Sequence, residues 1–61
     1  MGFLIFDLRA TEPEGLEDAL VLDTADTLEE AREAAKDQGG GVIYKDVENV
    51  EFKDLVEIVN A

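Results

Sequence analysis

The chain has 61 residues, with sixteen acidic side chains against five basic ones and a formal net charge of −11. A surface of this charge repels nucleic acid and anionic membrane, so direct binding to either is excluded as the leading function. Histidine, cysteine, serine and tryptophan are absent, which excludes hydrolytic triads, cysteine nucleophiles and imidazole metal sites within one chain. We therefore expect no enzyme, no cofactor and no metal site.

The chain length predicts one domain, residues 1–61, near the lower size limit for a self-sufficient core. Without disulfides or a structural zinc, such domains commonly gain stability by associating with themselves or with a partner. No apolar run approaches the roughly 20 residues of a membrane helix, and the run 3–6 is too short for a signal peptide. These features favour a soluble, cytoplasmic protein.

The acidic balance has three interpretations. Carboxylates can simply keep a small protein solvated. They can also suit a medium of high salt, where the self-repulsion of the chain is screened. Finally, an acidic surface can complement a basic surface on a partner. One such partner is a nucleic-acid-binding protein, for which the carboxylates would mimic phosphates.

The segment 2–9, GFLIFDLR, is predicted as the first strand. Four consecutive apolar residues, 3–6, belong to types that favour strands. An unbroken apolar run means that both faces of the strand need cover. We therefore place this strand centrally in the sheet, or at a contact with another subunit.

The segment 11–18, TEPEGLED, is predicted as a solvated loop because it combines proline, glycine and a high density of acids. Leu16 is the candidate for an inward anchor. A functional interpretation of the same residues is a recognition loop for a cation or a basic partner.

Residues 19–24, ALVLDT, are predicted as a second short strand, followed by a helix over about 27–38. Thr27 and Glu30 form a capping-box pattern, in which the threonine oxygen accepts from a first-turn amide and the glutamate reaches back to the amide of the cap. Three glycines, 39–41, tolerate positive φ and end the helix.

Residues 42–46, VIYKD, are predicted as the third strand. The stretch from residue 50 to 59 is favoured as a fourth strand because it is rich in β-branched residues, with a break at residues 53 and 54. Val50, Phe52, Val56 and Ile58 would then share one face. A helix over the same stretch stays open as the alternative.

Together these elements predict an α+β fold, a small two-layer sandwich of a three- to four-stranded sheet and one helix on one face, in the order β-β-α-β-β. Ala31, Ala34 and Ala35 allow the helix to approach the sheet closely. One helix covers one face, yet the first two strands are apolar on both. A C-terminal segment, a second subunit or a partner must shield the other face.

The stretch ALVLDTADTLEEAREAAKDQGGGVIY resembles a strand–helix–strand unit that recurs in small phage and prokaryotic proteins. It is also similar to part of the small phage-encoded inhibitors of host RNA polymerase. The resemblance covers less than half of the chain and rests on capping and packing residues. It implies a protein of phage type and carries no binding residue to this sequence.

The leading hypothesis is a non-enzymatic protein-interaction or assembly module that forms a homo-oligomer or docks on a protein partner. Its candidate contacts are Phe3, Ile5, Leu20 and Leu22. The alternative is an acidic effector that blocks the basic surface of a nucleic-acid-binding protein. Its candidate contacts are Glu12, Glu14, Glu17 and Asp18.

Overall fold

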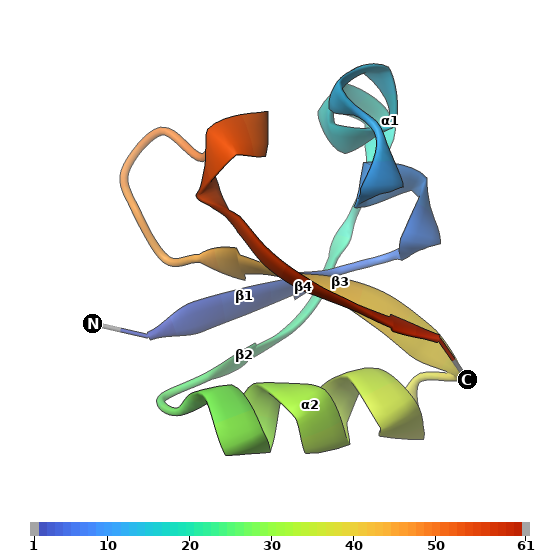
Figure 1. The fold of residues 1–61 in the computed structure, drawn as a ribbon, viewed down its shortest axis with the longest axis vertical. Coiled ribbons are helices and arrows are strands. Elements are labelled where there is room, and N and C mark those ends of the chain that lie inside the picture. Colours follow the sequence, from blue (N-terminus) through green and yellow to red (C-terminus); the bar gives the residue numbers. More distant parts are fainter. Residues whose placement is uncertain (1, 61) are drawn as a thin grey trace.

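A computed structural model describes residues 2–60 and shows an antiparallel four-stranded sheet in the order β2-β1-β3-β4 (Figure 1). The elements in chain order are β1 (Phe3–Phe6), the 3₁₀ turn η1 (Leu8–Thr11), α1 (Pro13–Asp18), β2 (Val21–Ala25), α2 (Leu28–Asp37), β3 (Gly40–Lys45), the 3₁₀ turn η2 (Phe52–Asp54) and β4 (Leu55–Asn60). The predicted α+β class is confirmed, and β1 is a central strand as expected.

Helix α2 has the start and the end that the sequence predicts. The Thr27 hydroxyl oxygen accepts from the amide of Glu30 at 3.2 Å. The Glu30 carboxylate accepts from the Thr27 hydroxyl at 3.1 Å rather than from the Thr27 amide, which corrects one half of the predicted capping box. Beyond the helix, Gly39 and Gly40 take φ values of 83° and 117°, in the region that favours glycine.

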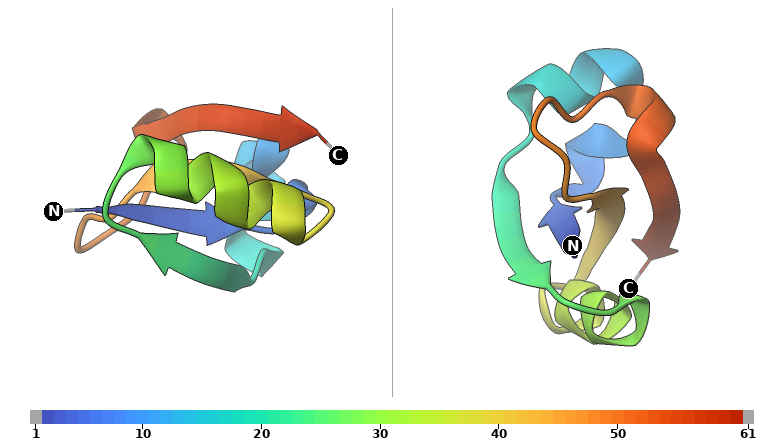
Figure 2. Two further views of the ribbon diagram at one scale, coloured as in Figure 1. Left: turned by 90° about the horizontal axis from the view of Figure 1, so that it is seen from below. Right: turned by 90° about the vertical axis from the view of Figure 1, so that its left-hand side faces the viewer.

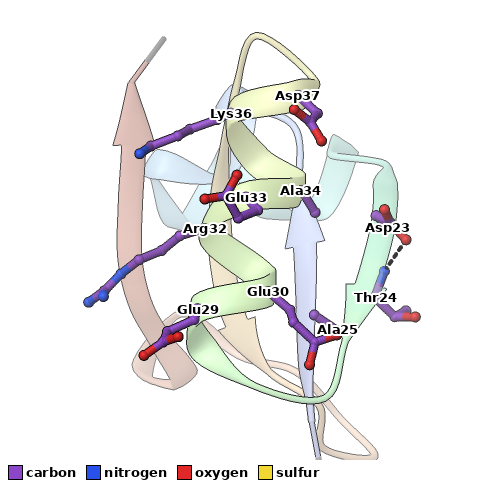
Figure 3. Close-up of a pocket in the computed structure, with 10 residues that line it drawn as sticks. All are labelled: Asp23, Thr24, Ala25, Glu29, Glu30, Arg32, Glu33, Ala34, Lys36 and Asp37. Atoms are coloured by element: carbon purple, nitrogen blue, oxygen red, sulfur yellow. Dashed lines mark hydrogen bonds between the residues drawn. The ribbon is translucent and has the colours of Figure 1, made fainter.

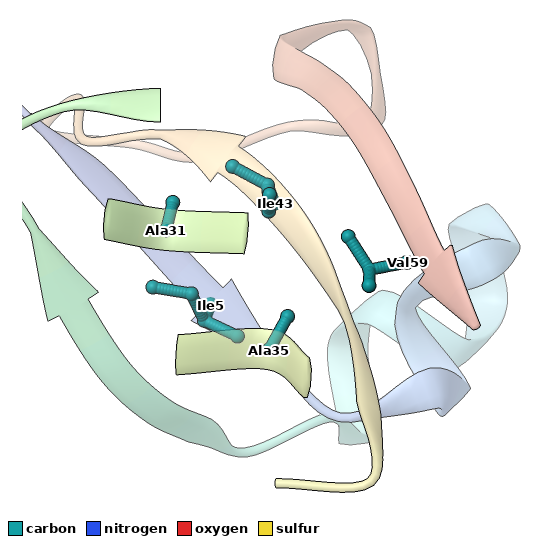
Figure 4. Packing of buried hydrophobic residues seen from close by; sticks show 5 residues of the cluster. All are labelled: Ile5, Ala31, Ala35, Ile43 and Val59. Atoms are coloured by element: carbon teal, nitrogen blue, oxygen red, sulfur yellow. The ribbon is translucent and has the colours of Figure 1, made fainter. Parts of the chain in front are cut away.

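The face of the sheet beneath α2 carries the first core. Ile5, Ile43 and Val59 from three strands meet Ala31 and Ala35 of the helix (Figure 4). Both alanines are fully buried. Their small side chains let the helix backbone lie close to the sheet, as the sequence predicts.

The opposite face carries a second core, which the chain covers by itself. Phe6, Val42 and Tyr44 of the sheet pack against Ala10 of η1. Residues that pack around this cluster come from both flanking segments and are Leu4, Leu16, Ala19, Val50 and Leu55. The prediction of a solvated loop over 11–18 is therefore wrong: η1 and α1 fold over the sheet opposite α2 (Figure 2).

One buried hydrogen bond fixes this cover. The Tyr44 hydroxyl donates to the carbonyl oxygen of Ala10 at 2.7 Å. The rings of Phe6 and Tyr44 stand edge to face, with centroids 5.3 Å apart. Helix α1 also packs closely on η1: a Cβ on Gly15 would collide with the carbonyl oxygen of Arg9.

Two strands differ from their predicted form. β1 ends at Phe6 because the carboxylate of Asp7 accepts from the amide of Arg9 at 2.9 Å and begins η1. The break predicted within the fourth strand, at residues 53 and 54, is present as η2, but β4 begins only at Leu55, so residues 50–52 are not part of the strand. The predicted common face of Val56 and Ile58 is wrong: a register shift in the β3–β4 pairing puts Val56 against the first core, while Ile58 pairs with Val42.

Across residues 2–60, none of the helices combines the length and the apolar character needed to cross a membrane.

The buried hydrogen bond of Tyr44 predicts the effect of removing a single oxygen. Tyr44→Phe keeps the ring but leaves the Ala10 carbonyl without its donor in a buried site. We expect the free energy of unfolding to fall by about 1–2 kcal/mol, measured by urea denaturation. An unchanged stability would mean that water reaches the Ala10 carbonyl.

Gly15 and Gly39 provide a matched pair of glycine-to-alanine substitutions. The Cβ added by Gly39→Ala would meet no atom within 4 Å, but the residue would keep a φ of 83°. The substitution should therefore lower the free energy of unfolding by about 1 kcal/mol. Gly15→Ala must push α1 away from η1. Its free energy of unfolding, measured by urea denaturation, should therefore fall by more. It should also expose the second core to a hydrophobic dye such as ANS. Equal losses without dye binding would contradict the close packing of α1 on η1.

Candidate docking surface

Strand β2 borders the sheet, and a run of apolar side chains at its start is exposed to solvent. It pairs with β1 on one side, and within residues 2–60 no strand pairs with its other side. Leu20, Val21 and Leu22 are 63%, 51% and 37% exposed. An apolar edge strand of this kind is a ready template for pairing with another chain.

Asp7 holds the start of this run in place. The amide of Asp7 donates to the carbonyl oxygen of Leu20, and the amide of Leu20 donates to Oδ2 of Asp7, both at 3.1 Å. Arg9 approaches the same carboxylate with Nη2 at 2.8 Å from Oδ2. The hydrogen bond from the Arg9 side chain is the main reason that the pKa of Asp7 falls from 3.8 to about 2.

The four apolar contacts predicted from the sequence separate into two pairs. Leu20, just before β2, and Leu22, within β2, are both exposed. Ile5 is fully buried in the first core, and the half-buried Phe3 packs against that core. The structure therefore brings only the leucine pair to the docking surface.

Sequence reasoning missed Val21 and Leu8 as surface residues. Leu8 is 42% exposed and follows β1, next to the residue that binds Leu20. A register shift in the β1–β2 pairing between Ile5 and Phe6 leaves Leu22 outside the regular pairs. Nothing in the local sequence signals that shift.

A groove of about 620 Å³ runs between β2 and α2 (Figure 3). On its β2 side, the carboxylates of Asp23, Glu30 and Asp37 line the groove without a basic neighbour (Figure 3). The two basic residues of the lining, Arg32 and Lys36, point the other way, toward β4 (Figure 3).

Arg32 is held on that side by a bidentate ion pair with Glu57 of β4. Its Nε and Nη2 lie 2.9 and 2.7 Å from the two carboxylate oxygens. The same contact lowers the pKa of Glu57 and raises that of Arg32. Helix α2 thus has an acidic side toward β2 and a mixed side toward β4.

The acids of the predicted recognition loop lie elsewhere. All four are exposed, on or just before α1, and none belongs to an ion pair within residues 2–60; they are Glu12, Glu14, Glu17 and Asp18. Because α1 and α2 lie on opposite faces of the sheet (Figure 1), these acids and the groove do not form one continuous surface.

In the part of the chain that the structure describes, no three acidic side chains are grouped so as to hold a metal ion. Comparison with protein-family models, with curated proteins and with solved structures finds no match to this chain.

The lowered pKa of Asp7 predicts a pH effect on stability. Because the folded-state pKa lies near 2, below the ordinary 3.8, the ionised carboxylate stabilises the fold above about pH 4. This contribution is lost as the pH falls toward 2. Asp7→Asn should lower stability at pH 7 and flatten the pH dependence between 4 and 2, measured by urea denaturation across that range. An equally steep dependence in the variant would assign it to other carboxylates.

Proposed function

We propose that this chain is a non-enzymatic protein-interaction or assembly module that docks through the open edge of β2, on a second copy or on another protein. The observation that carries the proposal is the run of three exposed apolar residues, Leu20 to Leu22, at the start of β2, a strand with one unpaired side within residues 2–60. In strand addition, main-chain hydrogen bonds supply affinity and alternate side chains supply specificity.

Two further features support docking at β2 in preference to the broad faces of the sheet. The broad faces of β1 and β3 are already covered, one by α2 and the other by η1 and α1. The start of the docking strand is held by two backbone contacts to Asp7. An edge that is fixed in place loses little conformational entropy when a partner binds.

The acidic effector is the second candidate function. The exposed acids on and before α1, which lack ion-pair partners in the described chain, favour it: Glu12, Glu14, Glu17 and Asp18. Salt separates the two candidates. Electrostatic docking of the effector weakens steeply with added salt, whereas the apolar contact between two copies at β2 does not.

Light scattering of the purified chain at low and high salt tests the assembly branch of the proposal. The charge of −11 opposes self-association at low salt, and about 1 M salt shortens the screening length to about 3 Å. We expect a monomer at low salt and association at high salt. Leu20→Ser with Leu22→Ser should remain monomeric in both.

Val47→Ser with Ile58→Ser is the matched control, because both residues are exposed outside β2 and Ile58 lies on the other edge strand. This variant should associate as the natural chain does. Association that survives the leucine changes would place the contact elsewhere. If the natural chain is a monomer at both salt concentrations, self-association is excluded and docking on a different protein remains.

A further inference from the structure

The pairing of β2 with β1 decides which of its side chains face α2. Asp23 and Ala25 pair with Ile5 and Phe3, which pack beneath α2, so they lie on the helix side of the sheet. Val21 pairs with Phe6 of the second core, so its exposed side chain lies on the opposite side. A strand added to this edge would continue the same alternation.

On the helix side, an added strand would run along the acidic wall of the groove. Asp37 lies toward the Asp23 end of the groove and Glu30 toward the Ala25 end (Figure 3). Seven positions separate the two helix acids, about 10 Å along a helix. Alternate side chains of a strand lie about 7 Å apart, so two or three of them can reach this row of carboxylates.

A second copy of the chain fits this edge poorly at low salt. Two copies paired antiparallel through β2 would form one continuous sheet, with both α2 helices on the same side of it. The carboxylates of Asp23, Glu30 and Asp37 would then face their counterparts across the junction. Like charges so placed oppose the pairing, and Asp23 itself is a charged edge residue of the kind that discourages indiscriminate strand addition.

From this charge pattern we propose that the β2 edge takes an extended segment of a partner protein in which lysine or arginine alternates with apolar residues. The basic side chains lie over the groove against Asp23, Glu30 and Asp37, and the apolar ones pack on the opposite side beside Val21. This inference rests on the proposed docking at β2 and adds the chemistry of the partner.

The test is an NMR titration of the natural chain, labelled with nitrogen-15, with a short capped peptide in which lysine alternates with valine. We expect shifts in the amides of β2 and of the adjoining side of α2. Replacing Asp23→Asn, Glu30→Gln and Asp37→Asn together should weaken binding about tenfold. Glutamine at position 30 keeps a side chain that suits a capping box.

The matched control is Glu12→Gln with Glu14→Gln and Glu17→Gln, which removes the same charge from α1 and the residue before it and should leave the affinity unchanged. Equal weakening by both triple variants would mean that only net charge matters and would overturn the proposal. Two control peptides need no substitution in the protein. One carries glutamate in place of lysine, and the other has its lysines grouped at one end.

Binding of either control peptide as tightly as the alternating one would also overturn the proposal. Failure of the lysine–valine peptide to bind at low salt would exclude a basic strand as the partner. Self-association through β2 is judged separately, by light scattering at high salt and by its loss in the Leu20→Ser, Leu22→Ser variant. Failure of the basic peptide to bind therefore leaves self-association at β2 open, and a monomer at both salts leaves the basic strand open.

Discussion

The hydrogen bond from the Tyr44 hydroxyl to the Ala10 carbonyl is the contact on which the rest of this structure depends. It joins the central strand β3 to the segment that crosses the second face of the sheet. A tyrosine hydroxyl is protonated and able to donate at neutral pH, and burial raises the pKa of Tyr44 further. A bond in a buried site is strong because no water competes for either atom. Together with the packing of Ala10, Leu16 and Ala19 on the second core, this bond holds a highly acidic segment on an apolar surface.

The two central strands serve both cores at once. In β1, Ile5 enters the first core and its neighbour Phe6 the second; in β3, Ile43 and Tyr44 divide in the same way. This follows from the alternation of side chains along a strand. Each core is a thin layer, and both cores are built on β1 and β3. A shift of either strand in one core therefore also moves side chains of the other core. The apolar surface that stays exposed on β2 lies at the border of the sheet, where one side of the strand has no neighbour.

Helix α2 was predictable from the sequence because its signals are local: the Thr27 cap, the alanines and the glycines after it all act within one segment. The cover formed by η1 and α1 was not predictable, since its tether joins residues 34 positions apart. The position of β2 at the border follows from the strand order, which also depends on pairings between residues far apart in the sequence. For the docking surface, Leu20 and Leu22 could be named from the sequence. Phe3 and Ile5 could not be told apart from them, because all four are apolar residues in short strands.

The strand order also has a consequence for how the chain folds as it leaves the ribosome. β1 is made first, yet its pairing with β3 joins Phe3 to Lys45, so the most apolar strand must wait until β3 has emerged. Antiparallel pairing with β2 is available earlier, but that pair alone leaves both faces of β1 bare. Non-local pairing of this kind slows folding and leaves nascent chains prone to aggregate. The like charge of the acids at 12, 14, 17 and 18, between the first two strands, opposes contact between such chains.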